Sequence, residues 1–245
     1  MKSFYLCIIS LFFLYSCSET SELEAFEKPY QDDLFYANKL VDSISQLLPF
    51  NPANKFDYVG ELHYELYQDY YAQLNDSLSL FQVSLTVEQL ANQQPKFINH
   101  FGNTYNFSHL NTITSLLDCN TSCVATVLSN SSLSLAAQEK MRIFFTDFEL
   151  LFEKSITSDG VLQYVFLFEE EIIHSSSFTS FDKSVILSTT SIARFSAYES
   201  KRRPKKNSDP EWDSLITNLL GSVVGCEYGI ADGLIASLIC GIQSN

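Results

Sequence analysis

The sequence predicts an all-α protein, in which a helical bundle of six or seven helices is followed by a glycine-rich C-terminal helix or helical hairpin. Apolar residues recur three and four positions apart over most of residues 31–200, which is typical of amphipathic helices. No segment alternates for long between polar and apolar residues, as a half-buried strand does. Small residues recur every four positions near the C-terminus. Together these patterns favour helices packed on helices.

Seven segments of the predicted bundle, taken in chain order, carry one apolar face each. Their expected ranges are about 31–48, 57–74, 86–95, 108–118, 134–154, 161–174 and 182–200. We expect Pro49 to end the first helix and Pro95 to end the third, because proline lacks the amide hydrogen that continues a helix. Thr86 and Gln89 have the spacing of a capping box. The aromatic content of 161–174 also suits a strand.

The N-terminus has the organisation of a bacterial export signal. Lys2 precedes an uncharged run of eleven residues, which is too short to span a bilayer because a spanning helix needs about 20 apolar residues. The next residues, Leu14-Tyr15-Ser16-Cys17, resemble the lipobox of bacterial lipoproteins, with a bulkier residue than usual at Tyr15. This resemblance implies that the signal peptide, residues 1–16, is removed and that the thiol of Cys17 carries a diacylglycerol.

The residues that follow Cys17 indicate where the lipidated chain resides. The next position is serine rather than aspartate, which by resemblance to Gram-negative sorting implies the outer membrane. Residues 17–30 are acidic and rich in serine, a composition that predicts a solvated tether and also resembles the tags of surface lipoproteins. We therefore expect a lipid anchor in the outer membrane, with the domain facing the periplasm or the cell surface.

The acidic composition limits the classes of partner that we expect. The chain has 15 Lys and Arg against 29 Asp and Glu, and its formal net charge is −14. Phosphate backbones repel such a chain, so nucleic acid is not an expected partner. The one basic run, at 201–206, lies in a Pro-containing linker at 201–210 that we interpret as exposed, with protease cleavage or anionic lipid binding as alternatives. The expected contacts are the membrane through the lipid anchor, and a protein partner or a second copy through the tail.

Four cysteines remain after Cys7 leaves with the signal and Cys17 takes lipid. They are Cys119, Cys123, Cys226 and Cys240. An exported protein can form disulfides, and four cysteines allow three pairings among which the sequence does not choose. The C-x₃-C spacing of the first two suits a local bridge and lacks the second pair that a zinc site needs. We therefore expect disulfides and no metal or cofactor.

The tail at 211–245 carries the regularly spaced small residues. They are Gly221, Gly225, Gly229, Gly233, Ser237 and Gly241. Each glycine inside a helix costs about 1 kcal/mol relative to alanine, so this stripe needs a compensating gain. Close approach of two helix backbones supplies such a gain, and the pattern resembles a glycine zipper.

Two arrangements of this tail are open. Residues 215–242 are numerous enough to span a bilayer and could self-associate there, as pore-forming or bacteriocin-like peptides do. However, Glu227 and Asp232 lie in the middle of this segment, and an acid at the bilayer centre costs about 2.5–3.5 kcal/mol. The alternative is a helical hairpin that turns near Glu227 to Gly229 and packs on the bundle.

No pattern in the sequence assigns catalytic residues. Glu171 and His174 form a single E-x-x-H pair, whereas carboxylate-bridged metal bundles use two such pairs. We interpret the run Glu169 to Glu171 as a solvated face. The sequence has neither the serine-nucleophile motif G-x-S-x-G nor a phosphate-binding glycine loop. An enzyme is therefore the least favoured of the functions considered.

Two further resemblances concern the family and the surface. Asn51-Pro52 with Gly60-Glu61-Leu62-His63, and the segment 186–198, loosely resemble uncharacterised helical lipoproteins with glycine-rich tails, which implies no activity. Asp76-Ser77-Leu78 resembles the acceptor of a bacterial O-glycosylation system, with Ser77 as the candidate residue. We therefore expect a lipid-anchored binding or structural module of the cell envelope, with a membrane-active tail as the first alternative.

Overall fold

The computed structural model describes residues 48–73, 78–117, 123–153, 157–200 and 211–244, which belong to one compact unit that begins at Ile44. In these ranges the regular secondary structure is helical throughout, which confirms the all-α prediction and makes 161–174 a helix rather than a strand. The described helices are α2 (Asp57–Gln73), α3 (Leu80–Ala91), α4 (Pro95–Phe101), α5 (Leu110–Leu117), α6 (Cys123–Asn130), α7 (Leu135–Glu153), α8 (Ser158–His174), α9 (Ser180–Ser200), α10 (Glu211–Gly225) and α11 (Ile230–Gln243).

Eight of the described helices lie between residues 57 and 200, where we expected six or seven. The additional helices are short. α4 begins at Pro95, where we expected a helix to end, and α6 begins at Cys123, where we expected a loop. Proline fits the start of α4 because an amide in the first turn has no acceptor within the helix. Gln94 caps this turn by accepting a hydrogen bond from the Lys96 nitrogen at 3.2 Å.

The start of α3 also differs from the expectation. Its capping box is formed by Ser79 and Gln82 rather than by Thr86 and Gln89: the Ser79 hydroxyl accepts from the Gln82 nitrogen at 3.4 Å, and the Gln82 side chain accepts from the Ser79 nitrogen at 3.0 Å. The earlier start places Val83 in the helix, on its buried face. Thr86 lies inside the helix and donates to the Gln82 carbonyl at 2.9 Å.

One buried carboxylate holds the starts of α7 and α9 together. Asp182 accepts from the nitrogen and the hydroxyl of Ser134, immediately before α7, at 2.9 Å each. It also accepts from the nitrogen and the hydroxyl of Thr179, immediately before α9, at 2.9 and 2.8 Å. Amides at helix starts have no partner inside their helix, and a negative charge there is favoured by the helix dipole.

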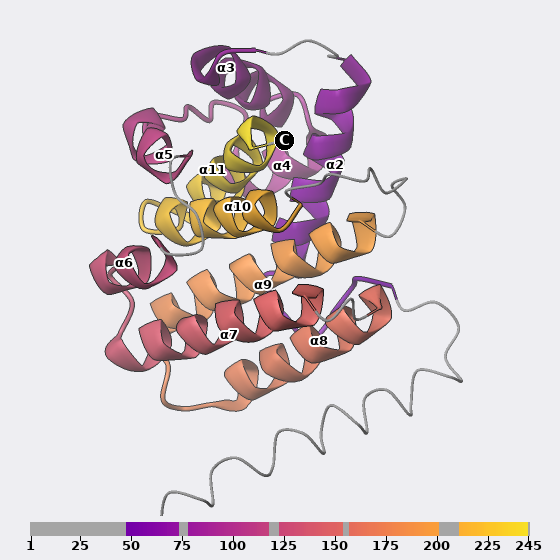
Figure 1. Cartoon of the computed structure of the whole chain (residues 1–245). Helices are drawn as coiled ribbons and strands as arrows, with labels where there is room; N and C mark the ends of the chain where they lie inside the picture. The colour runs from indigo at the N-terminus through magenta and orange to yellow at the C-terminus, as the bar shows by residue number, and fades with distance from the viewer. Residues whose placement is uncertain (1–47, 74–77, 118–122, 154–156, 201–210, 245) are drawn as a thin grey trace, which may run out of the picture. The chain divides into compact units, whose positions relative to one another are not determined.

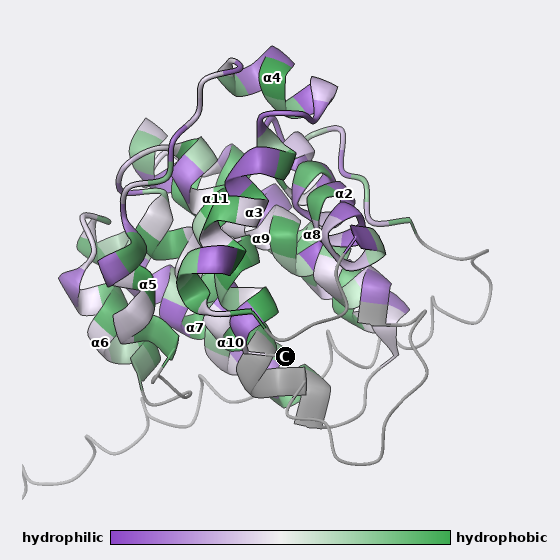
Figure 2. Ribbon diagram, turned by 90° about the horizontal axis from the view of Figure 1, so that it is seen from above, coloured by the Kyte–Doolittle hydropathy of each residue, from purple (hydrophilic) through white to green (hydrophobic). Residues whose placement is uncertain are grey.

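The hairpin of α10 and α11 lies between the other helices of the domain (Figure 1). α10 packs against α5, α6, α7 and α9, and α11 packs against α2, α3, α5 and α9. Every residue of α11 from Gly233 to Ile242 is buried, and hydrophobic residues run along both helices (Figure 2). Of the two arrangements left open by the sequence, the hairpin is the one observed.

None of the helices in the described ranges combines the length and the hydrophobicity that crossing a membrane requires.

Candidate functional site

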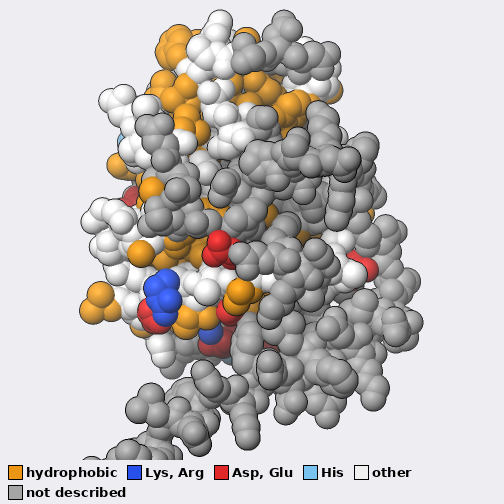
Figure 3. Space-filling model, viewed as in Figure 1, with side chains coloured by type: hydrophobic (Ala, Val, Ile, Leu, Met, Phe, Trp, Pro, Cys, Tyr) orange, Lys and Arg blue, Asp and Glu red, His pale blue; other side chains and the backbone are white. Residues whose placement is uncertain are grey.

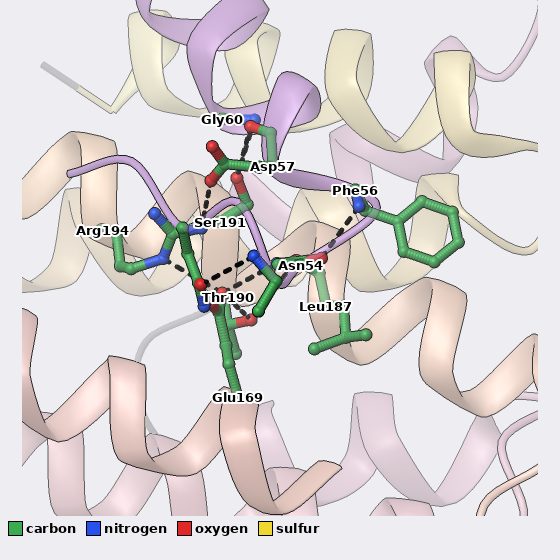
Figure 4. A network of polar contacts seen from close by, with 11 residues as sticks. Asn54, Phe56, Asp57, Gly60, Glu169, Leu187, Thr190, Ser191 and Arg194 are labelled. Atoms are coloured by element: carbon green, nitrogen blue, oxygen red, sulfur yellow. Dashed lines mark hydrogen bonds and ion pairs between the residues drawn. The ribbon is translucent and has the colours of Figure 1, made fainter. Parts of the chain in front are cut away.

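The contact between α8 and α9 contains an ion pair without solvent exposure (Figure 4). Arg194 of α9 donates from Nε to Oε1 of Glu169 of α8 at 3.1 Å, and both side chains are 0% exposed. Arg194 also donates from Nη2 to Oδ1 of Asp57, in the first turn of α2, at 2.5 Å. The guanidinium carbon lies 5.3 Å from the centre of the Phe166 ring and 5.9 Å from that of Phe195. Three helices therefore meet at one cation.

The segment before α2 completes the surroundings of the Glu169 carboxylate. Asn51 donates to Oε2 at 2.6 Å, and Asn54 donates to Oε1 at 3.0 Å and to the Leu187 carbonyl at 2.9 Å. The hydroxyl of Thr190 donates to Oε1 at 2.8 Å. These hydrogen bonds, together with the one from Arg194, compensate for the lost hydration of a buried charge.

α2 and α9 approach closely beside this ion pair because Gly60 has no side chain. The Gly60 nitrogen donates to Oγ of Ser191 at 3.1 Å, and that hydroxyl donates to the Asp57 carbonyl at 2.9 Å. A Cβ atom at Gly60 would lie 2.5 Å from the Ser191 carbonyl oxygen and 2.6 Å from the ring of Phe195. The start of α2 is therefore locked onto α9 by both shape and hydrogen bonds.

Helical periodicity did not reveal this network. We expected Glu169 on a solvated face with Glu170 and Glu171, and this expectation is wrong for Glu169, whereas the other two are exposed. Glu171 pairs with Lys140 at 2.6 Å. The sequence did contain one indication of this network, which is Arg194. A cation among the apolar and small residues of α9 needs a buried acid as its partner.

The arrangement serves to position helices. Glu169 and Arg194 have no solvent exposure, so no substrate reaches their charged atoms. The Nη1 atom of Arg194 has no hydrogen-bond partner. Bringing two charges out of water costs free energy, so an intact buried pair adds little to net stability. Removing one partner destabilises the fold strongly, because the other charge stays buried without a partner.

A second buried polar contact joins α2 to the hairpin. His63 of α2 is buried and shares a hydrogen bond with Asn218 of α10, and Oδ1 of Asn218 accepts from the hydroxyl of Ser237 of α11. The Nε2 atom of His63 has no hydrogen-bond partner. Burial lowers the pKa of His63 from its ordinary 6.5 to about 4, against an opposing effect of the bond with Asn218. The ring is therefore neutral at neutral pH.

The two hairpin helices pack at glycines. A Cβ atom on Gly221 would lie 2.9 Å from the Ala236 carbonyl oxygen, and one on Gly225 would lie 2.7 Å from the Cα of Gly233. A Cβ atom on Gly233 would collide with Sγ of Cys226. Any larger side chain at these positions would therefore push α10 and α11 apart.

The remaining members of the four-residue series have different surroundings. Gly229 is not in a helix: it lies in the turn with a φ of 155°, a conformation that favours glycine. Ser237 donates its hydroxyl to Asn218. Gly241 also faces Asn218, whose Nδ2 would lie 3.3 Å from an added Cβ. The series therefore serves two helices and the turn between them.

The two acids near the turn of the hairpin, Glu227 and Asp232, are hydrogen-bonded by neighbouring loops. Glu227 accepts from the nitrogen and the hydroxyl of Ser132 at 2.5 and 2.8 Å. Oδ1 of Asp232 accepts from the hydroxyl of Tyr105 at 2.9 Å. Burial and the charge of Asp232 raise the pKa of Tyr105, so its hydroxyl stays protonated and donates. These contacts fix the turn of the hairpin against the loops before α5 and α7.

The cysteines divide into a bonded and a free group. Cys123 is disulfide-bonded. Cys226 and Cys240 are free, buried thiols, and burial raises the pKa of each to about 12. The candidate disulfide between them is not formed, because Sγ of Cys226 lies against Gly233, whereas Cys240 comes seven positions later in α11, about 10 Å along the helix.

Some candidate residues lie outside the described ranges: the lipidation residue Cys17, the candidate disulfide residue Cys119 and the candidate glycosylation residue Ser77. Within those ranges, no three side chains of His, Cys, Asp or Glu are grouped so that they could hold a metal ion. Comparisons with protein families, with curated proteins and with solved structures found no match to this chain.

Proposed function

We propose that this chain is a lipid-anchored protein of the outer membrane, whose helical domain acts as a binding or structural module. The observation that carries the proposal is the use of the apolar tail as the centre of the domain. The N-terminal apolar run is expected to leave with the signal. Since the tail is occupied in folding, attachment to the membrane falls to acyl chains on Cys17.

The glycine-zipper interpretation belongs to the same proposal. Gly221 and Gly225 of α10 pack against α11, so the small residues supply close packing within one chain. Such packing offsets the cost of glycine in a helix, which is about 1 kcal/mol for each residue. The zipper would then be a device of the fold, used in place of contact between copies.

A binding role has support from the surface of α3. Phe81 is 61% exposed and Leu85, one turn later, is 41% exposed. Figure 3 shows hydrophobic side chains gathered at the end of the molecule where α3 lies. Paired apolar residues on a surface favour a protein partner. Replacing both with serine should abolish crosslinking to that partner in intact membranes without changing the unfolding midpoint, and unchanged crosslinking would remove this support.

The anchor is tested by changing Cys17→Ser in the full chain. We expect the variant to move from the membrane fraction to the soluble fraction, because no acyl chain would be attached. Mass spectrometry of the wild-type N-terminus should find the lipid on Cys17. An unchanged membrane fraction, or a leader peptide that is still present, would contradict the proposal.

A second candidate is a membrane-active or self-associating tail. The observation that favours it is the apolar character of α11, whose residues from Gly233 to Ile242 are all buried and largely apolar. A peptide of residues 207–245 should then release dye from vesicles, whereas the full chain should not. Absence of leakage and of vesicle binding by the peptide would exclude this candidate.

A further inference from the structure

His63 lies where α2 meets the hairpin. The ring is 4% exposed, and its neighbour Asn218 connects it to both helices of the hairpin, through its own place on α10 and through Ser237 of α11. One ring nitrogen, Nε2, has no partner. A neutral imidazole needs only one donor bond, so this site suits the uncharged ring.

A protonated ring would have two N–H donors and a positive charge at this place. Nε2 would then bury a donor without an acceptor, and the charge would lack a counter-charge. The side chains of α10 that the structure describes, residues 215–225, include no charged residue. The described part of α10 therefore offers this ring no charge that would stabilise its protonated form.

The carboxylates on the helices around His63 are bonded elsewhere. They are Asp57, Glu61 and Glu65 on α2, Glu88 on α3, Glu199 on α9 and Asp232 on α11. Arg194 of α9 is held by Glu169, and Lys183 donates to a carbonyl. Asp69 is exposed and Asp182 caps two helices. None of these contacts involves His63, and the pKa of His63 is shifted by burial and by Asn218 rather than by a neighbouring charge.

We propose that His63 is an acid-sensitive joint, and that its protonation separates the α10–α11 hairpin from α2 while the rest of the domain remains helical. The contact at His63 is separate from the turn of the hairpin, where Glu227 accepts from Ser132 and Asp232 accepts from Tyr105. The joint would change how much apolar hairpin surface the anchored domain exposes, which is a conformational role beyond that of a static module.

The sign of the effect follows from linkage. Burial holds the pKa of His63 at about 4, below its ordinary value of 6.5, so the unfolded or open chain binds the proton more strongly. The closed form is therefore favoured above pH 6.5 and loses that advantage as the pH falls toward 4.

Cys226 and Cys240 provide the measurement, because both are buried free thiols of the hairpin. Their labelling by an aromatic disulfide reagent, which reacts with thiols in acid as well as at neutral pH, would be followed by peptide mapping in the full chain from neutral pH to about pH 4, together with the helical circular dichroism signal. We expect labelling of these two thiols to rise severalfold in the wild-type chain while the helical signal is kept. His63→Gln should retain the slow labelling of neutral pH throughout, because an amide can replace the bond to Asn218 and does not take a proton.

His174→Gln is the matched control, since His174 is exposed at the end of α8 and its change should leave the wild-type transition intact. The proposal would be overturned if labelling of Cys226 and Cys240 rose equally in wild type and in His63→Gln as the pH falls, or if it did not rise in wild type. If His63→Gln fails to fold, the NMR shifts of the His63 ring in the wild-type chain decide. Titration together with the rise in labelling of Cys226 and Cys240 supports the joint, and titration near pH 6.5 without that rise overturns it.

Discussion

The Nε atom of Arg194 and Oε1 of Glu169 lie 3.1 Å apart in a place where neither side chain contacts solvent. The same guanidinium binds Asp57 of α2, and the same carboxylate binds Asn51 and Asn54, which precede α2. Because α2, α8 and α9 all contribute, the ion pair determines how three helices meet. Removing one member of such a buried pair costs more than the intact pair contributes to net stability, because the other member is left without a counter-charge.

Arg194→Met should destabilise the fold by about 3–5 kcal/mol, because Glu169 and Asp57 would lose their counter-charge and the hydrogen bonds that it donates. Urea unfolding at neutral pH measures the change. The control is Arg142→Met, since Arg142 forms an exposed pair with Glu139 at 2.5 Å, and exposed pairs contribute little. Similar losses in the two variants would show that burial of the Arg194 pair has no special effect.

Alanine at a hairpin glycine should destabilise the fold, and the loss should be larger where the new methyl group would contact backbone than where it would contact a side chain. Gly225→Ala would place Cβ against the backbone of α11, 2.7 Å from the Gly233 Cα, so we expect a loss of about 1–3 kcal/mol. Gly241→Ala would first meet the side chain of Asn218, at 3.3 Å, and the loss should be smaller. Thermal unfolding of both variants checks the order, and a larger loss in Gly241→Ala would contradict the packing described.

The long helices were predictable because each buries one regular face. Residues 134–154 were expected to be helical, and α7 spans Leu135–Glu153 with Met141, Phe144 and Phe148 buried on one face. The short helices α4 and α6 were missed because one or two turns carry too little periodicity. The Glu169 network was missed because it depends on contacts between residues that are distant in sequence. Asn51 and Glu169 are 118 positions apart, and a local pattern of residues does not predict such a contact.

The glycine spacing predicted close packing but not the place of every glycine. Gly225 and Gly233 lie where two helices touch, whereas Gly229 has the same spacing and lies in the turn. Equal spacing in sequence cannot distinguish a helix face from a turn, because glycine is favoured in both for different physical reasons.

Asp182→Asn should destabilise the domain at neutral pH by about 1–3 kcal/mol, because an amide group cannot accept all the bonds from Ser134 and Thr179. Burial acts to raise the pKa of Asp182, but these hydrogen bonds outweigh it and the pKa lies below its ordinary 3.8. The wild-type advantage is therefore present above pH 3.8 and lost as the pH falls further. Urea unfolding at pH 7 and near pH 3 tests this, with exposed Asp69→Asn as the control. If the free energies of unfolding of wild type and Asp182→Asn differed equally at both pH values, the prediction would be contradicted.

Cys226 and Cys240 should resist alkylation until the chain unfolds. Both thiols are buried and free, and burial raises the pKa of each to about 12, so very little reactive thiolate exists at neutral pH. Alkylation without a reducing agent, followed by peptide mapping, should leave both residues unmodified in the native chain and modify both in urea. Modification in the native chain would show that the hairpin opens readily. Protection that persists in urea and ends only on reduction would mean that the two cysteines are disulfide-bonded, and the packing of the Cys226 sulfur against Gly233 would then be wrong.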